Sequence, residues 1–396
     1  MVRRAVRWLG VLGGFALGIV ACGSPKPAVV DESAALAAAE WAELPAPPLR
    51  PRSHVVGVWS GREVFYVGGD TFLCPAGASC AAPDEPPLAD GAAFDPGTES
   101  WRAISPAPVA FSSASTAVVG DDIYFLIAGS PGWPGAEPAF LRYSISADAW
   151  QELAQPDGDL GWYQLVAADG VVVAFSGSDE AGGRPDLVFD PSSGDWEELP
   201  PDPLAPGFDR TMVWSRPDLY LFDHELVPNP GSAGPSLTRA ARLDLGTGEW
   251  KRLPDSEILA TGPWFVEDQI MVNPDLGGAD GGEVNNWGRR YPNGGVFDTA
   301  SAVWSELQAA PPRADYSVGV IGSRDALIYG TKGWLLDLAS GSWIELPQLP
   351  ESGAYTQRMV VTAGTDAVVF GGERWRDGLD GELLGDAWMW RSGRTP

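Results

Sequence analysis

The sequence predicts an all-β protein built from repeated four-stranded antiparallel sheets. One hairpin recurs, most plainly at residues 190–196, Asp-Pro-Ser-Ser-Gly-Asp-Trp, and its first residue and its Trp lie six positions apart in every copy. The chain holds 49 Gly, 36 Pro and 18 Trp, and 44% of its residues are apolar, a mixture typical of many short strands joined by tight turns. The hairpin copies are Asp95/Trp101, Ser144/Trp150, Asp190/Trp196, Asp244/Trp250, Asp298/Trp304 and Asp337/Trp343.

Two apolar runs joined by a turn, and then a third run, precede each hairpin, so each unit supplies four strands. The expected first strands are His54–Trp59, Ser115–Val119, Leu165–Ala168, Thr211–Trp214, Trp264–Val266, Ser317–Ile321 and Arg358–Thr362. The expected second strands are Val64–Gly69, Ile123–Gly129, Val171–Phe175, Leu219–Phe222, Ile270–Val272, Ala326–Tyr329 and Ala367–Gly372. The expected third strands are Ala92–Phe94, Leu141–Tyr143, Leu187–Phe189, Ala241–Leu243, Gly295–Phe297, Trp334–Leu336 and Ala387–Trp390, and each fourth strand begins at the hairpin Trp.

The last unit lacks a fourth strand, whereas Trp41-Ala-Glu-Leu-Pro near the start is a fourth strand without a unit. Pairing the two completes seven four-stranded sheets. A ring closed in this way leaves few exposed sheet edges, which is how a β-propeller avoids edge-to-edge aggregation. We therefore expect a seven-bladed β-propeller of four-stranded antiparallel blades, closed by an N-terminal strand that pairs into the last blade.

The repeats resemble those of the kelch family. Gly68-Gly69 and Gly371-Gly372 follow the second strand of their units, and a Phe-Asp hairpin and a Trp come after them. The interval between successive Trp residues averages about 50, the period typical of kelch repeats. Residues 39–396 are thus similar to a single kelch propeller of the galactose oxidase kind, although the glycine pair shrinks to one glycine at Gly129, Gly177 and Gly330.

The N-terminus predicts export and a lipid anchor. Residues 1–21 begin with basic residues and continue as an apolar run too short for a comfortable membrane span, as in a secretory signal. Ile-Val-Ala-Cys22 resembles a bacterial lipobox, which implies cleavage before Cys22 and lipidation of its thiol; an ordinary signal with an incidental cysteine is the alternative. Residues 22–38 read as a flexible tether. We expect a lipoprotein of the bacterial cell envelope, either periplasmic or on the cell surface.

Charge limits the class of partner. The chain has 26 basic and 53 acidic residues and a net charge of −27. Such a surface repels phosphate backbones, so we expect no nucleic-acid partner. Solubility is the ordinary explanation of the charge, and recruitment of cations or basic partners is the alternative.

Cys74 and Cys80 are expected to form a disulfide. They lie in one Gly/Pro-rich loop of an exported chain, and they form an even pair. A metal or redox role is disfavoured because no His is nearby and a redox dithiol usually has only two intervening residues.

A ligand site is expected on one face of the ring. Strand direction alternates within each sheet, so the links from second to third strand share a face with the starts of the innermost strands. The long irregular links are 70–91, 130–139, 224–239, 274–294 and 373–386, and such loops on a rigid scaffold commonly bind ligands. Aromatic, Arg and Asp side chains at the channel mouth suit a glycan or a peptide with acidic groups; alternatively they fill the mouth and pair locally. The candidate ligand-binding residues are Arg52, His54, Tyr163, Asp209, Arg210, Trp264, Asp315, Tyr316 and Arg358.

Catalytic and metal-binding patterns are sparse. His54 and His224 are the only histidines, so the copper chemistry of galactose oxidase is not carried over. A Ser-His-Asp arrangement with His54 stays open, but no nucleophile-elbow sequence accompanies it. The acidic loops 275–283 and 377–382 lack the spacing of an EF-hand. We expect no cofactor, no bound metal and no catalytic residue.

The sequence therefore favours a binding module over an enzyme: an exported, lipid-anchored propeller that binds a glycan, peptide or partner protein on the long-loop face. Two alternatives stay open. One is a carbohydrate-active enzyme of isomerase or lyase type with its site at the channel mouth. The other is a structural envelope protein without a small ligand.

Overall fold

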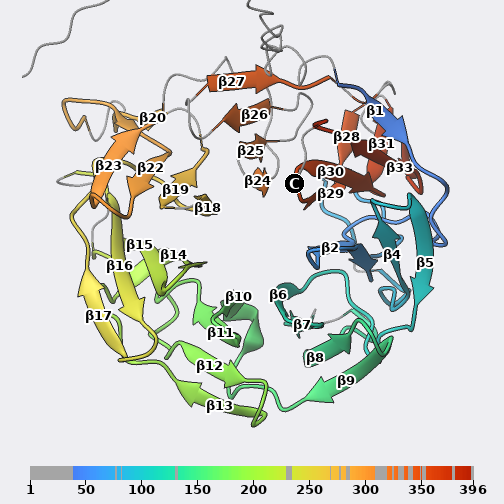
Figure 1. Cartoon of the computed structure of the whole chain (residues 1–396), viewed down its shortest axis with the longest axis horizontal. Coiled ribbons are helices and arrows are strands. Elements are labelled where there is room, and N and C mark those ends of the chain that lie inside the picture. The colour runs from blue at the N-terminus through green and yellow to red at the C-terminus, as the bar shows by residue number, and fades with distance from the viewer. Residues whose placement is uncertain are drawn as a thin grey trace, which may run out of the picture.

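The computed structural model is an all-β molecule in which four-stranded antiparallel sheets follow one another around a ring (Figure 1). Its only helical element among the described residues is one turn of 3₁₀-helix, η1 (Leu160–Trp162). The all-β prediction is confirmed. The structure describes residues 39–75, 78–81, 83–129, 133–228, 234–267, 269–275, 278–281, 286–307, 319–322, 325–328, 334–337, 342–347, 349, 354–376 and 380–393.

Each four-stranded sheet takes its strands in chain order from the centre of the ring outward, except the one that contains both chain ends. The first three sheets are β2–β5 (Val56–Trp59, Val64–Val67, Gly91–Asp95, Ser100–Ile104), β6–β9 (Ser115–Val119, Asp122–Ile127, Ala139–Ser144, Ala149–Leu153) and β10–β13 (Tyr163–Ala168, Val171–Ser176, Leu187–Asp190, Asp195–Glu198). The next are β14–β17 (Gly207–Ser215, Asp218–Glu225, Thr238–Asp244, Glu249–Arg252), β18, β19, β22 and β23 (Phe265–Glu267, Ile270–Asn273, Gly295–Asp298, Val303–Glu306), and β24–β27 (Gly319–Gly322, Asp325–Ile328, Trp334–Asp337, Ser342–Glu345).

The remaining four-stranded sheet joins the two ends of the described chain. Its order is β29 (Met359–Ala363), β30 (Asp366–Phe370), β33 (Ala387–Trp390) and β1 (Trp41–Glu43). Trp41 lies opposite Trp390 and Glu43 lies opposite Trp388 in the antiparallel register. The N-terminal strand therefore occupies the outer position that the other sheets fill with the strand after the hairpin.

The fixed spacing of the recurrent hairpin follows from its turn. In the copy at residues 244–250, Oδ1 of Asp244 accepts hydrogen bonds from the backbone N–H groups of Gly246 at 2.9 Å and Thr247 at 3.1 Å. An Asp side chain stabilises a turn in this way by bonding amides two or three residues on. The register then places Leu243 opposite Trp250, so the Trp enters the outermost strand directly after the turn.

Several of the tryptophans at the start of outer strands also link their sheet to the one before it, although Nε1 of Trp101 and of Trp343 has no such partner among the described residues. The indole Nε1–H of Trp250 donates to the carbonyl oxygen of Pro200 at 2.8 Å, and that of Trp304 donates to Pro254 at 2.7 Å. Each acceptor lies four residues after the preceding hairpin Trp. The same rule holds for Trp150 to Ser105, Trp196 to Ala154 and, across the chain ends, Trp41 to Pro347.

The core lies between neighbouring sheets, as repeated sheets with two apolar faces require. One cluster combines Phe65 and Ala93 of the first sheet with Phe125 and Leu141 of the second, all of them fully buried. Aromatic rings contact across these layers, for example Tyr66 of β3 and Phe370 of β30, whose centroids are 5.2 Å apart. Each sheet is therefore stabilised by both of its neighbours.

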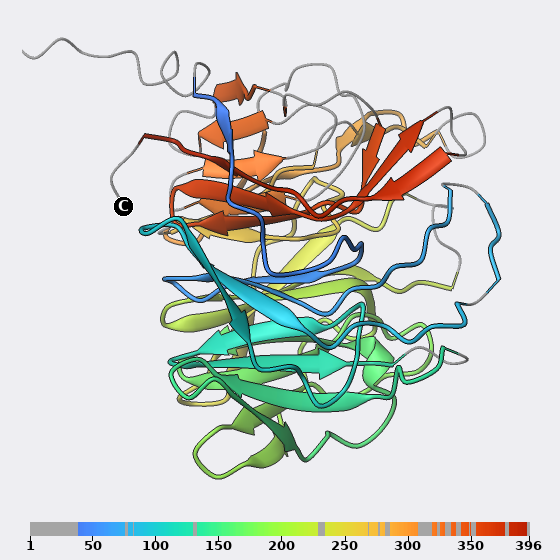
Figure 2. The ribbon, with the colours of Figure 1, turned by 90° about the vertical axis from the view of Figure 1, so that its right-hand side faces the viewer.

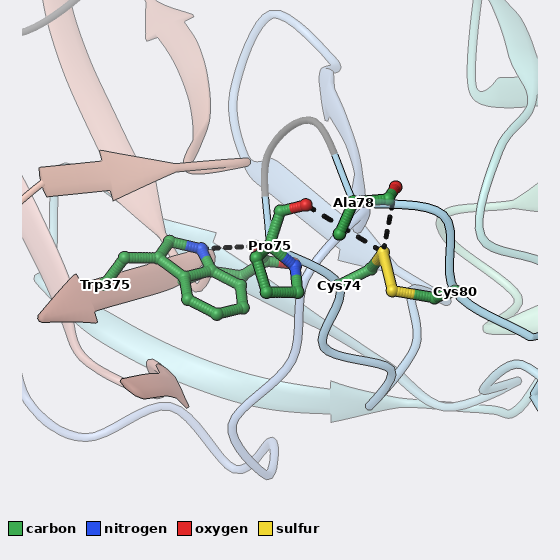
Figure 3. The surroundings of a disulfide bond; sticks show 6 residues. Cys74, Pro75, Ala78, Cys80 and Trp375 are labelled. Carbon is green, nitrogen blue, oxygen red and sulfur yellow. Dashed lines mark hydrogen bonds between the residues drawn. A yellow bond between two sulfur atoms is a disulfide. The ribbon is translucent and has the colours of Figure 1, made fainter. Parts of the chain in front are cut away.

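Two of the long links contain strands of their own, unlike the irregular loops expected from the sequence. β28 (Ala354–Thr356), β31 (Glu373–Arg376) and β32 (Asp380–Leu383) form a three-stranded sheet, and β20 (Gly278–Ala279) pairs with β21 (Tyr291–Pro292). The expected disulfide between Cys74 and Cys80 is present, and Trp375 of β31 lies in its surroundings (Figure 3). Figure 2 shows the blue link after β3 and the red strands of the three-stranded sheet projecting on the same side of the ring.

No helix within the described ranges has the length and apolar character needed to cross a membrane.

Candidate functional site

The candidate site lies where the chain enters the innermost strands. β2, β14 and β29 are the edge strands of their sheets that face the centre of the ring (Figure 1). A positive φ occurs at the entry to each of these strands. It is 52° at His54 and 56° at Gln357, just before β2 and β29, and 49° at Asp209, near the start of β14. A positive φ is uncommon for a residue other than glycine, and strained residues of this kind cluster at functional sites. These three positions are equivalent in their repeats and share the face on which the long links lie, called here the long-link face.

His54 is oriented by a buried carboxylate. Its Nδ1 lies 3.0 Å from Oδ2 of Asp70; the His54 side chain is 37% exposed and that of Asp70 only 3%. The hydroxyl of Ser53 donates to the other oxygen of Asp70 at 3.3 Å, and the N–H of Phe72 donates to that oxygen at 3.0 Å. Asp70 is therefore fixed on both oxygens, and it fixes one nitrogen of the imidazole.

Backbone pairing brings Asp70 to His54. Ser53 and Asp70 exchange two backbone hydrogen bonds, of 3.0 and 2.9 Å, in an isolated bridge. Gly69 makes this approach feasible: its φ is +91°, and a Cβ there would lie 2.6 Å from the carbonyl oxygen of Ser53. Only glycine combines that backbone conformation with so close a neighbour. The Gly68-Gly69 pair of the sequence thus serves to place the acid that follows it.

The last repeat builds a similar arrangement beside the first. Glu373 follows Gly371-Gly372 as Asp70 follows Gly68-Gly69, and it is almost fully buried. Its Oε2 accepts hydrogen bonds from the Thr356 hydroxyl at 3.0 Å and from Nε1 of Trp375 at 2.9 Å. The N–H of Gly372 donates to the carbonyl oxygen of Arg52 at 2.8 Å, so the two repeats join next to His54.

The charges around His54 favour its protonated form. The hydrogen bond to Asp70 raises the pKa of His54 above its ordinary value of 6.5, and the charges of Asp70 and Glu373 raise it further, while partial burial opposes them. The imidazole therefore titrates above the range of a solvated histidine. Both acids come from turns after second strands, one in each of the two adjoining repeats.

Arg52 and Arg210 are buried at the predicted site, and aspartates already engage them: Asp90, which is half exposed, pairs with Arg52, and the buried Asp186 and Asp202 pair with Arg210. Both terminal nitrogens of Arg52 donate to Asp90 at 2.8 Å, and its side chain is fully buried. Arg210 donates to Asp186 at 3.0 and 2.7 Å and to Asp202 at 3.0 Å, and only 2% of its side chain is exposed. These ion pairs connect strand ends, so both arginines have a structural role in the described conformation.

Arg358 and Tyr163 also contact other parts of the chain. Nη2 of Arg358 donates to Asp386 at 2.9 Å, and its guanidinium lies 5.0 Å from the ring centroid of Tyr355. The hydroxyl of Tyr163 donates to the carbonyl oxygen of Pro185 at 3.1 Å. Burial raises the pKa of Tyr163, which keeps this hydroxyl a hydrogen-bond donor.

The remaining candidates divide between core, surface and undescribed chain. Trp264 is buried and stacks on Phe222 with ring centroids 4.2 Å apart, which makes it part of the core between two sheets. Asp209 is exposed at a bulge of β14. Asp315, Tyr316 and Cys22 lie outside the described residues, as do the segments 1–21 and 22–38.

The structure adds Asp70 and Glu373, which sequence reasoning did not single out. The signal available was an acid directly after each of the two Gly-Gly pairs, in the first and last repeats. The two acids are separated by most of the chain. They come close together only because the first and last repeats are neighbours in the ring. Ser53 and Thr356, equivalent hydroxyl residues, complete the two arrangements.

His224 differs from His54 in every relevant respect. It is buried, and its Nε2 lies 2.8 Å from the carbonyl oxygen of Ala260.

The described part of the chain brings together no group of three or more His, Cys, Asp or Glu side chains that could hold a metal ion. His54 is thus the titratable side chain whose geometry suits contact with a ligand.

Comparison with known proteins gives only a distant structural likeness. No protein-family model and no curated protein matches the sequence. Among solved structures the chain is similar to YjhT, with 13% sequence identity and a TM-score of 0.44, over 87% of this chain and 96% of that one.

Proposed function

We propose that this chain is an exported, lipid-anchored, kelch-like β-propeller of seven blades, closed by β1, that binds a glycan, a peptide or a partner protein on the long-link face. Residues 1–21 act as the signal peptide, Cys22 carries the lipid, and residues 22–38 hold the propeller away from the membrane of the bacterial envelope. The pairing of β1 with β33 supports the closure.

The observation that carries the binding proposal is the build of the long links. The disulfide of the link after β3 and the sheet β28–β31–β32 give ordered structure to insertions that a ring of sheets does not itself need. Both stand on the same side of the ring (Figure 2). Loops that a rigid scaffold positions in this way are where binding residues are usually found. An envelope protein with a purely structural role gives no reason for them.

Within this face, His54 and Asp209 are the proposed contacts that solvent reaches directly. Tyr163, Arg52, Arg210, Trp264 and Arg358 support the face from beneath, through the contacts described above. The net charge of −27 makes anionic ligands unfavourable, so neutral or basic ones are expected.

Matched charge reversals test the binding face. Asp209→Lys changes the long-link face, whereas Asp169→Lys changes the turn between β10 and β11 on the opposite face; both aspartates are exposed and have φ near 47°, at 49° and 46°. A neutral glycan array and a basic peptide array are probed with the purified chain. Binding lost in Asp209→Lys and kept in Asp169→Lys supports the proposal. Equal binding by both variants, or no binding by the parent chain, refutes it.

The anchor is tested separately. Cells fed radiolabelled palmitate should label the parent protein and not Cys22→Ser, and the variant should leave the membrane fraction. Label retained in Cys22→Ser would exclude lipidation at this cysteine.

A carbohydrate-active enzyme is the second candidate, and one observation favours it. A carboxylate-oriented histidine on the ligand face is a common arrangement for proton transfer. This arrangement is developed below.

A further inference from the structure

The two nitrogens of the His54 imidazole have different surroundings: Nδ1 is held by a carboxylate, and Nε2 can contact a ligand. Nδ1 is bound to Asp70, which is itself fixed by Ser53 and by the N–H of Phe72. Nε2 makes no hydrogen bond to the described chain, and the side chain is 37% exposed. A carboxylate at Nδ1 places the proton of the neutral ring on that nitrogen, so Nε2 carries the lone pair. The ring therefore presents a base, in one tautomer, to the long-link face.

We propose that His54 is a catalytic base on the long-link face, with Asp70 as its positioning residue, and that it accepts a proton from an uncharged, hydroxyl-bearing substrate. The proposal goes beyond ligand binding, because it assigns a proton transfer to the lone pair of Nε2.

The surroundings define the substrate class. Two buried carboxylates act on the imidazole, Asp70 from the turn after β3 and Glu373 from β31, and no cation is among the charges that affect it. An anionic substrate would be repelled by both. Glu373 is already bonded to Thr356 and Trp375, so it acts at a distance and does not compete for the proton. A neutral hydroxyl can approach Nε2 without an electrostatic penalty.

The backbone conformation of His54 gives a second, independent reason to assign this residue a chemical role. Its φ of 52° costs free energy unless the surroundings hold it, and here the two hydrogen bonds of the Ser53–Asp70 bridge do so. The equivalent residue in the last repeat is Gln357, with a φ of 56°. The fold therefore accepts an uncharged amide at this position. This backbone conformation therefore does not by itself require a histidine, and proton transfer is the chemistry that Gln lacks.

The step can be followed with a probe that needs only a base. In 5-nitrobenzisoxazole, the lone pair of Nε2 takes the proton on C3, the C–H electron pair forms the nitrile, and the N–O bond breaks with its electrons on the phenolate oxygen. The imidazolium then returns the proton to water. The coloured phenolate reports the rate, and no other reactant is consumed.

The experiment compares the full chain with three variants. His54→Gln removes the base and keeps the side chain that the last repeat tolerates at this φ. Asp70→Asn keeps the shape and removes the charge. Asp169→Asn changes an exposed residue of positive φ in the turn between β10 and β11, on the opposite face, and serves as the control. Circular dichroism verifies that each variant is folded.

Expected rates follow from the usual contribution of a positioned base, on the order of 10² to 10⁴-fold. Because the probe is not the natural substrate, we expect the parent chain to exceed N-acetylhistidine at equal concentration by about tenfold or more. His54→Gln should fall to the buffer rate, Asp70→Asn should lose about tenfold, and Asp169→Asn should match the parent. Equal rates for the parent and His54→Gln, or a parent no faster than N-acetylhistidine, would overturn the proposal.

The ¹⁵N signals of the two histidines separate positioning from simple structural support. The parent should show His54 with its proton on Nδ1, and Asp70→Asn should show a mixture of tautomers. The rate should rise with pH around the pKa that the same signals give, because only the neutral ring accepts a proton. An unchanged tautomer in Asp70→Asn, or a rate independent of that pKa, refutes the dyad. Failure of the arrays described above would leave these readouts unaffected, so the two proposals fail separately.

Discussion

The chain of indole hydrogen bonds between sheets can be tested by replacing Trp250 with Phe. The change removes the Nε1–H that donates to Pro200 at 2.8 Å and keeps an aromatic ring in the layer. Trp101→Phe is the matched control, since Nε1 of Trp101 is buried and has no partner in the described chain. A hydrogen bond contributes about 1 kcal/mol net, and a buried donor without a partner costs about 1 to 3 kcal/mol.

We therefore expect Trp250→Phe to destabilise the protein by about 2 to 4 kcal/mol more than Trp101→Phe, because Trp250→Phe loses a hydrogen bond whereas Trp101→Phe removes a buried donor without a partner; the loss of ring area is common to both. Urea unfolding followed by circular dichroism measures the difference as a shift in midpoint at constant slope. Trp304→Phe, which loses the bond to Pro254, should behave like Trp250→Phe. If Trp101→Phe lowered the free energy of unfolding as much as the other two variants, packing of the ring alone would explain why a Trp recurs at this position of the repeats. The proposed linking role of the indole N–H would then be wrong.

Further predictions follow from burial and charge. Arg210→Ala leaves two buried aspartates without their cation and should cost about 3 to 5 kcal/mol in urea unfolding, whereas Arg216→Ala, whose side chain is 80% exposed, should change stability by less than about 0.5 kcal/mol. Gly69→Ala should cost more than about 1 kcal/mol, because its Cβ would meet a backbone carbonyl at 2.6 Å and its φ is positive; a variant as stable as the parent would contradict that geometry. The raised pKa of His54 means that its contribution to stability is complete below the unfolded pKa and is lost as pH rises through the folded pKa. The parent should accordingly lose stability relative to His54→Gln over that interval, and a difference that does not vary with pH would refute the pairing with Asp70.

The sequence was a good guide to the sheets because their signals are local. The six-residue spacing of the hairpin depends on one Asp side chain and the two amides after it, all within a single turn. Continuous apolar runs locate strands such as β7 and β11 to within a residue or two. The sequence does not predict the strands within the 373–386 link. β31 pairs with β28, which precedes the last four-stranded sheet in the chain, and the residues of β31 show no alternation of apolar and polar types.

The site was harder to predict because its partners are remote in sequence. His54 was singled out from its place at the start of a strand, but its orientation depends on Asp70, which a glycine pair brings back to it. The sequence places Arg52 and Arg210 at the channel mouth, but their acceptors, Asp90 and Asp186, are recognisable only from the three-dimensional pairing of strand ends. A charged residue at a strand start does not reveal, by itself, whether its charge is already engaged.

The pairing of β1 with β33 has a consequence for biosynthesis. Trp41 contacts Pro347, 306 positions later, and its strand partner lies later still. β1 therefore leaves the ribosome long before its partner β33, and contacts of such separation form slowly. Until then β1 and β30 each expose an unpaired edge, which favours association with other chains. A chaperone that holds the nascent or translocating chain should therefore affect the yield of folded protein more than its final stability.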